Sequence, residues 1–64
     1  MSPSQILVHQ ELKRYPKVQS QIIAETLEGT VSLIEVKKCL VELADMGKAR
    51  FVETMRLGQV WIAL

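Results

Sequence analysis

The stretch Ser20–Gly47 constrains the fold of this chain more than any other part of the sequence. Apolar residues recur there at helical spacing in two runs, over about 20–27 and about 33–46, and Gly29 lies in the short turn between them. In the second run, three apolar residues share one helical face: Val36, Leu40 and Leu43. Two helices joined by a tight, glycine-containing turn form a helix-turn-helix pattern, although an αα-hairpin that packs only for stability would show the same spacing.

Both ends of the second helix of this pattern are marked in the sequence. Ser32 and Glu35 have the spacing of a capping box, in which the serine hydroxyl accepts from the Glu35 N–H and the Glu35 carboxylate accepts from the Ser32 N–H. Gly47 follows the last periodic residues and can adopt the positive φ that is common just past a helix end. These signals predict a helix that begins near Leu33 and ends near Met46.

A further helix is predicted before this stretch, over about 3–15. Ser2 suits its N-cap position, Pro3 the first helical position and Gln5 the third. Three residues form its apolar face: Val8, Leu12 and Tyr15. His9 lies beside that face. Because no second His and no Cys accompanies it, we interpret His9 as a partly buried packing residue rather than as a metal ligand or a base.

The periodicity changes after Gly47. Two runs that alternate apolar and polar residues, 48–54 and 59–64, are rich in β-forming residues and are separated by a short loop that closes on Gly58. This pattern predicts a β-hairpin over about 48–64.

Three single residues bear on how the hairpin packs. Pro16 biases the residue before it away from a helical conformation. Val18 is then predicted to be an extended residue that could pair with a later strand. Trp61 lies on the opposite strand face from three apolar residues, Val60, Ile62 and Leu64. One of the two faces must therefore be partly exposed or covered by a partner, and we interpret Trp61 as a core or dimer anchor rather than a platform for base stacking.

Length and composition exclude several classes of protein. Sixty-four residues form one domain, and 48% hydrophobic residues argue against disorder and for a dimer that covers leftover apolar surface. The net charge of +1 and the pI of about 7.9 are far from those of strongly basic nucleic-acid binders.

The single cysteine, Cys39, can form neither an internal disulfide nor a structural zinc site, and we expect it to be a small buried hydrophobe. Without a signal-peptide pattern or a long apolar run, the chain is expected to be cytoplasmic and not in a membrane.

Three helices followed by a two-stranded hairpin, with an extended residue between the first two helices, resemble a winged helix-turn-helix domain of the α+β class. The resemblance covers almost the whole chain and is carried by Leu12, Val18, Ile23, Ala24, Leu27, Val36, Leu40, Leu43, Gly47, Phe51 and Trp61. The pattern is most similar to compact bacterial regulators of the FeoC-like kind, in which Leu-x-x-Met-Gly-Lys closes the third helix, here Leu43–Lys48. That group carries a cysteine cluster in its wing, and this chain has no cysteine there.

The chain is also similar to winged helices that bind left-handed DNA and whose wing ends with a tryptophan. Those proteins use an Asn and a Tyr on the third helix. The corresponding region of this chain carries Lys37, Lys38 and Val41 instead, which does not support that specialised activity.

The resemblance implies double-stranded DNA as the partner, with the third helix in the major groove and the wing on the backbone or the minor groove. Eight residues are candidates for DNA contact: Lys17, Gln19, Gln21, Ser32, Lys37, Lys38, Arg50 and Arg56. The lysine pair on the third helix could contact phosphates or guanine edges, and the five cations of the set could neutralise about four or five phosphates per monomer.

Charge and chemistry leave a second hypothesis open. Between residues 31 and 47 the chain has three acidic and two basic residues, so the predicted third helix is slightly acidic. The lysine pair could be an ordinary solvated face, and Arg56 could protect a strand edge. The first hypothesis is therefore a DNA-binding transcriptional regulator acting as a dimer, and the alternative is a winged helix that docks on another protein. One His, one Cys and three isolated glycines offer no catalytic arrangement, so we expect neither an enzyme nor a metal or cofactor.

Overall fold

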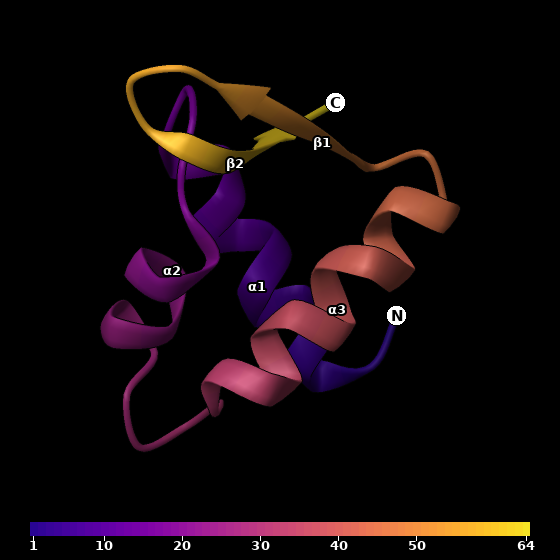
Figure 1. Cartoon of the computed structure of the whole chain (residues 1–64). Helices are drawn as coiled ribbons and strands as arrows, with labels where there is room; N and C mark the ends of the chain where they lie inside the picture. Colours follow the sequence, from indigo (N-terminus) through magenta and orange to yellow (C-terminus); the bar gives the residue numbers. More distant parts are fainter.

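The computed structural model describes all of residues 1–64 as three helices followed by one antiparallel hairpin (Figure 1). The elements are α1 (Pro3–Arg14), α2 (Ser20–Thr26), α3 (Leu33–Asp45), β1 (Ala49–Thr54) and β2 (Gly58–Ala63). This architecture confirms the α+β class and the order of elements predicted from the sequence. Each predicted helix ran one residue too far, because the residues at 15, 27 and 46 are C-caps: Tyr15, Leu27 and Met46.

The helix starts differ from the prediction in one respect. In α1 the Ser2 hydroxyl accepts from the Gln5 N–H and the Gln5 side chain accepts from the Ser2 N–H, which is a complete capping box. In α3 the Ser32 hydroxyl accepts from the Glu35 N–H at 3.2 Å, but the predicted return bond from the Ser32 N–H is not formed. The Glu35 carboxylate instead lies 4.0 Å from the thiol of Cys39, one turn further along the helix.

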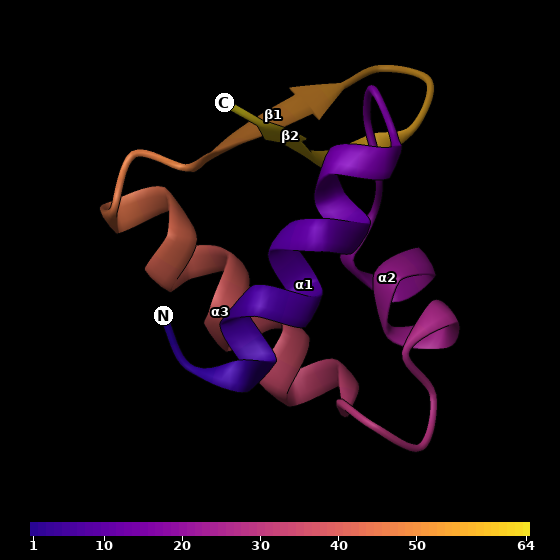
Figure 2. The same cartoon turned by 180° about the vertical axis from the view of Figure 1, so that it is seen from behind.

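The core gathers around the inner face of α3, which packs against both other helices and β1. Its residues come from all three helices, the connections after α1 and α2, and the start of β1: Val8, Leu12, Val18, Ile23, Val31, Val36, Cys39, Leu40, Leu43 and Ala49. Seen from behind, α1 lies across α3 (Figure 2). Full burial of a large aliphatic side chain stabilises the fold by about 1.5–3 kcal/mol, and Leu40 and Leu43 of the predicted apolar stripe each contribute on this scale.

β2 forms backbone hydrogen bonds along both of its edges. It pairs with β1 along its whole length, and Trp61 also pairs with Val18, with N–H···O distances of 3.1 and 2.7 Å. The predicted pairing of Val18 with a later strand is thus confirmed. Trp61 packs on the core, as predicted for an anchor, and its ring meets that of Phe51 edge to face at 5.1 Å between centroids. On the opposite strand face Val60 is buried and Leu64 is exposed.

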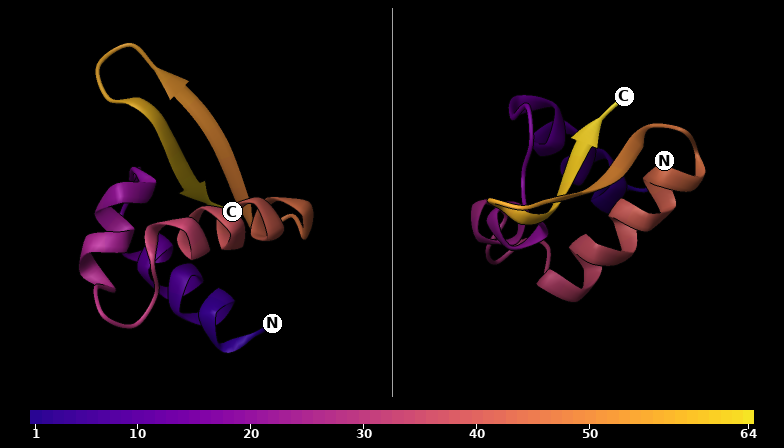
Figure 3. Two further views of the ribbon diagram at one scale, coloured as in Figure 1. Left: turned by 60° about the horizontal axis from the view of Figure 1, so that its bottom comes forward. Right: turned by 45° about the horizontal axis from the view of Figure 1, so that its top comes forward.

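The C-terminal end of α3 sets the direction of the hairpin. Gly47 has a φ of 75°, the Lys48 N–H donates to the Leu43 carbonyl and the Gly47 N–H donates to the Ala44 carbonyl, which together form a Schellman motif. The C′ role predicted for Gly47 is confirmed. The chain therefore turns sharply into β1, and the hairpin rises from the C-terminal end of α3 (Figure 3).

Candidate nucleic-acid interface

The outer face of α3, which we define as Ile34, Lys37, Lys38 and Val41, points away from the core. Both lysines are exposed, and the exposed fractions of Ile34 and Val41 are 82% and 53%. The exposure of Ile34 was not anticipated. Its position two residues before the buried Val36, about 200° around the helix, is the signal that would have revealed it. The face therefore combines two cations with two aliphatic side chains.

The acidic residues of α3 border this outer face, since Glu35 and Glu42 lie three and four residues from Lys38 along the helix. Glu35 and Glu42 are half-buried, and Glu42 accepts a hydrogen bond of 2.9 Å from Gln5 Nε2 on α1. Asp45 alone is exposed, in the last turn. A helix with an acidic excess in its sequence thus presents its two lysines to the solvent, while Glu42 is held by Gln5 of α1 and Glu35 lies beside Cys39 of its own helix.

The loop of the hairpin, Met55–Leu57, which we call the wing tip, is held by side-chain hydrogen bonds. Thr54 Oγ1 accepts from the Leu57 N–H at 2.9 Å and donates to the Gly58 carbonyl at 3.1 Å. Gln19 Nε2 donates to the Leu57 carbonyl, so the segment before α2 is tied to the loop. The side-chain amide of Gln19 therefore stabilises the wing tip.

Lys17 and Arg56 are brought together at the wing tip. Both line a shallow hollow of ≈ 430 Å³ with Thr54, Met55 and Leu57, and no acidic residue takes part in it. These two cations are far apart in the sequence and meet only because Val18 pairs with β2. This end of the molecule is consequently basic.

The other candidates are separate from both groups. Gln21 shares a hollow with Glu25 and Glu28, where a phosphate would be repelled. Ser32 caps α3 and lines an adjoining hollow with Glu28. Arg50 is exposed on β1, opposite Ile62. The eight candidates thus form a lysine pair on α3, a basic wing tip with Gln19, one cation on β1, and two polar residues in an acidic region.

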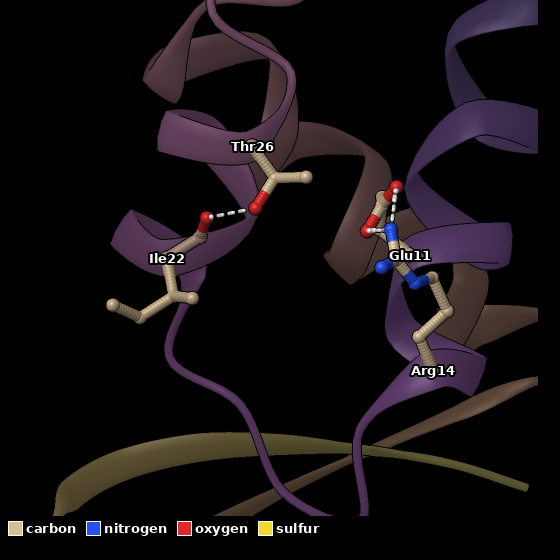
Figure 4. Close-up of polar contacts among 4 residues, drawn as sticks. All are labelled: Glu11, Arg14, Ile22 and Thr26. Atoms are coloured by element: carbon tan, nitrogen blue, oxygen red, sulfur yellow. Dashed lines mark hydrogen bonds and ion pairs between the residues drawn. The ribbon is translucent and has the colours of Figure 1, made fainter.

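One cation outside the candidate set is neutralised. On α1, Arg14 Nη1 donates to both carboxylate oxygens of Glu11 at 3.1 Å (Figure 4). On α2, which lies close by, the Thr26 hydroxyl donates to the Ile22 carbonyl. The pair between Arg14 and Glu11 is the only ion pair in the structure. The candidate cations therefore keep their charge free for a ligand.

Two side chains, His9 and Cys39, have perturbed pKa values. Burial, then Lys13 and Lys48, lower the pKa of His9, whose Nε2 is buried without a hydrogen-bond partner. Burial, then Glu35 and Glu42, raise the pKa of the Cys39 thiol, which makes it a poor nucleophile. No group of three His, Cys, Asp or Glu side chains is placed to hold a metal ion.

Comparison with known proteins gives no relative: no family model, no curated protein and no solved structure matches the chain. The resemblance to FeoC-like regulators therefore depends on the sequence pattern alone. None of the helices combines the length and the apolar character that crossing a bilayer requires.

Proposed function

We propose that this chain is a DNA-binding domain that regulates transcription, with α3 in the major groove of a duplex and the wing tip on its backbone. The observation that carries the proposal is the exposure of Lys37 and Lys38 on α3, beside glutamates that are half-buried and of which Glu42 is engaged by Gln5. The phosphates along a DNA groove attract exposed lysines, and they would repel a helix whose carboxylates were equally exposed.

The outer face of α3 has the chemistry that base readout needs. Lysine ammonium groups contact phosphates or the O6 and N7 acceptors of guanine, and aliphatic side chains contact the methyl group of thymine. Lys37 and Lys38 supply the first kind of contact and Ile34 and Val41 the second. The wing tip adds Lys17 and Arg56, which suit phosphates because their hollow contains no carboxylate.

The interface is modest in charge. Five candidate cations, Lys17, Lys37, Lys38, Arg50 and Arg56, set an upper limit on the phosphates neutralised. At about 0.9 per contact, the slope of log K against log salt should be no steeper than about −4.5 per monomer. Gln19, Gln21 and Ser32 are left out of the proposed interface, because Gln19 holds the wing tip and the other two lie beside glutamates.

The test is a salt titration of binding to a labelled duplex by fluorescence anisotropy, between about 50 and 200 mM salt. Lys37→Ala combined with Lys38→Ala should weaken binding and make the slope shallower by about 1 for each lysine that contacts a phosphate. The matched control is Lys13→Ala with Lys48→Ala, which removes the same charge near His9 rather than on the outer face.

The control should retain the slope of the wild type. Equal losses in the two double variants would mean that the lysine pair acts only through net charge and that α3 is not in the groove. No binding by the wild type at low salt would reject the DNA-binding function.

A protein-docking function is the alternative, and the exposure of Ile34 and Val41 favours it. Seven residues apart on one helix face, they form a short apolar stripe that a partner helix could cover. Ile34→Ser with Val41→Ser separates the hypotheses. Under the DNA hypothesis this variant changes sequence preference and keeps the salt slope, whereas under the docking hypothesis it abolishes capture of the partner.

A further inference from the structure

The two ends of the molecule carry side chains of opposite charge. The wing tip and the connection between α2 and α3 lie at opposite ends in both Figure 1 and Figure 2. At the wing tip, Met55 is fully exposed and Leu57 is half exposed, beside the cations Lys17 and Arg56. This end therefore exposes two apolar side chains beside two cations, and the exposed Glu53 lies two residues before Met55 on β1.

The opposite end is hollowed and acidic. Two adjoining hollows of ≈ 380 and ≈ 620 Å³ share three lining residues, Ala24, Glu28 and Leu33. Glu25 lines the larger hollow, and Leu33 is 39% exposed. We call this region the turn hollow. Its lining provides apolar contact from Ala24 and Leu33 and two carboxylates, and it contains no cation.

We propose that copies of this chain associate head to tail, with the wing tip of one copy docked in the turn hollow of the next. Met55 would contact Ala24 and Leu33 of the neighbouring copy, which removes its side chain from water. Lys17 and Arg56 would face the carboxylates of Glu25 and Glu28, which have no ion-pair partner within their own chain. Charge complementarity of this kind fixes both the partner and the orientation.

The occupant is a second copy because one chain carries both halves of the contact and cannot join them itself. The molecule is at most 31 Å long, and the two regions lie at its two ends. Since the wing tip and the turn hollow are different surfaces, the contact is heterologous and each copy can accept a further one, which gives chains or a ring rather than a closed two-fold dimer. The proposal does not depend on DNA binding.

Sedimentation velocity of the full chain over a range of protein concentrations, without DNA, tests the proposal. The weight-average mass of the wild type should rise with concentration and pass beyond that of a dimer. Arg56→Glu and Glu28→Arg each place like charges in the contact, so either variant should weaken association about tenfold or more. Both positions are exposed, so the fold should tolerate the changes, and circular dichroism checks this.

The decisive control combines Arg56→Glu with Glu28→Arg in one chain, which restores the net charge of the wild type and reverses the ion pair. This double variant should regain the association of the wild type, as should an equimolar mixture of the two single variants. A wild type that is monomeric at every concentration, a dimer that neither single variant weakens, or a double variant that stays monomeric would each overturn the proposal. Because Lys17 and Arg56 belong also to the proposed DNA interface, the duplex titration is a separate experiment, and either proposal can fail alone.

Discussion

Truncation of Leu40 is the most direct test of how this chain stays folded. Leu40 is fully buried in the inner face of α3. Leu→Ala changes at such sites cost about 2–5 kcal/mol, because apolar contacts are lost and a cavity remains. At about 0.05–0.15 kcal/mol per residue, a chain of 64 residues has an unfolding free energy of roughly 3–10 kcal/mol. Leu40→Ala should therefore remove about half of the stability and lower Tm by at least about 8 °C.

The measurement is urea unfolding followed by circular dichroism, with Val41→Ala as the matched control. Val41 is the next residue of the same helix and has 53% of its side chain exposed, so its truncation should change the unfolding free energy by no more than about 0.5 kcal/mol. If Leu40→Ala is unfolded in water, Leu40→Met keeps the test quantitative, with an expected cost below about 1.5 kcal/mol. Equal effects of Leu40→Ala and Val41→Ala would refute the assignment of the inner face.

Two further predictions concern pH and the end of α3. The pKa of His9 is lowered in the folded chain, so the unfolded chain binds a proton first as the pH falls below about 6.5. The unfolding free energy should therefore decrease as the pH falls from about 7.5 to about 5.5. Above this range His9 should make no contribution to the pH dependence. His9→Gln should flatten that part of the urea-melt profile, and an unaltered profile would contradict the assignment. Gly47→Ala should cost about 1–2 kcal/mol in the same assay, because φ is 75° and no atom lies within 4 Å of an added Cβ, so the loss is purely conformational. Unchanged stability would mean that the helix end can rearrange.

The fold was predictable where local chemistry decides the structure. The Ser2 and Gly47 signals act over three or four residues, and both helix ends form as predicted. The Glu35 side chain was predicted wrongly, because its conformation also depends on Cys39 one turn away and on the packing of that helix face. A pattern of residue types records where a cap can form and not which of two nearby partners a flexible carboxylate takes.

The candidate site was only partly predictable for a related reason. Lys37 and Lys38 could be named from helical spacing, whereas the hydrogen bond that engages Glu42 comes from Gln5 on another helix. Likewise, Lys17 and Arg56 share a hollow only because the chain brings distant segments together. Net charge counted along the sequence therefore does not describe the surface, since what a ligand meets is the charge left exposed after packing.

The pair of hydrogen bonds between Val18 and Trp61 has a consequence for how the molecule can move. A hairpin attached only through Gly47 could swing as a hinged flap, but these bonds fasten its strand β2 to the segment between α1 and α2. Displacing the hairpin would require breaking both bonds and removing the partly buried Trp61 from its contacts with the core. We therefore expect the hairpin and the helices to unfold together, so that a ligand held at the wing tip and α3 would meet two surfaces in fixed relation.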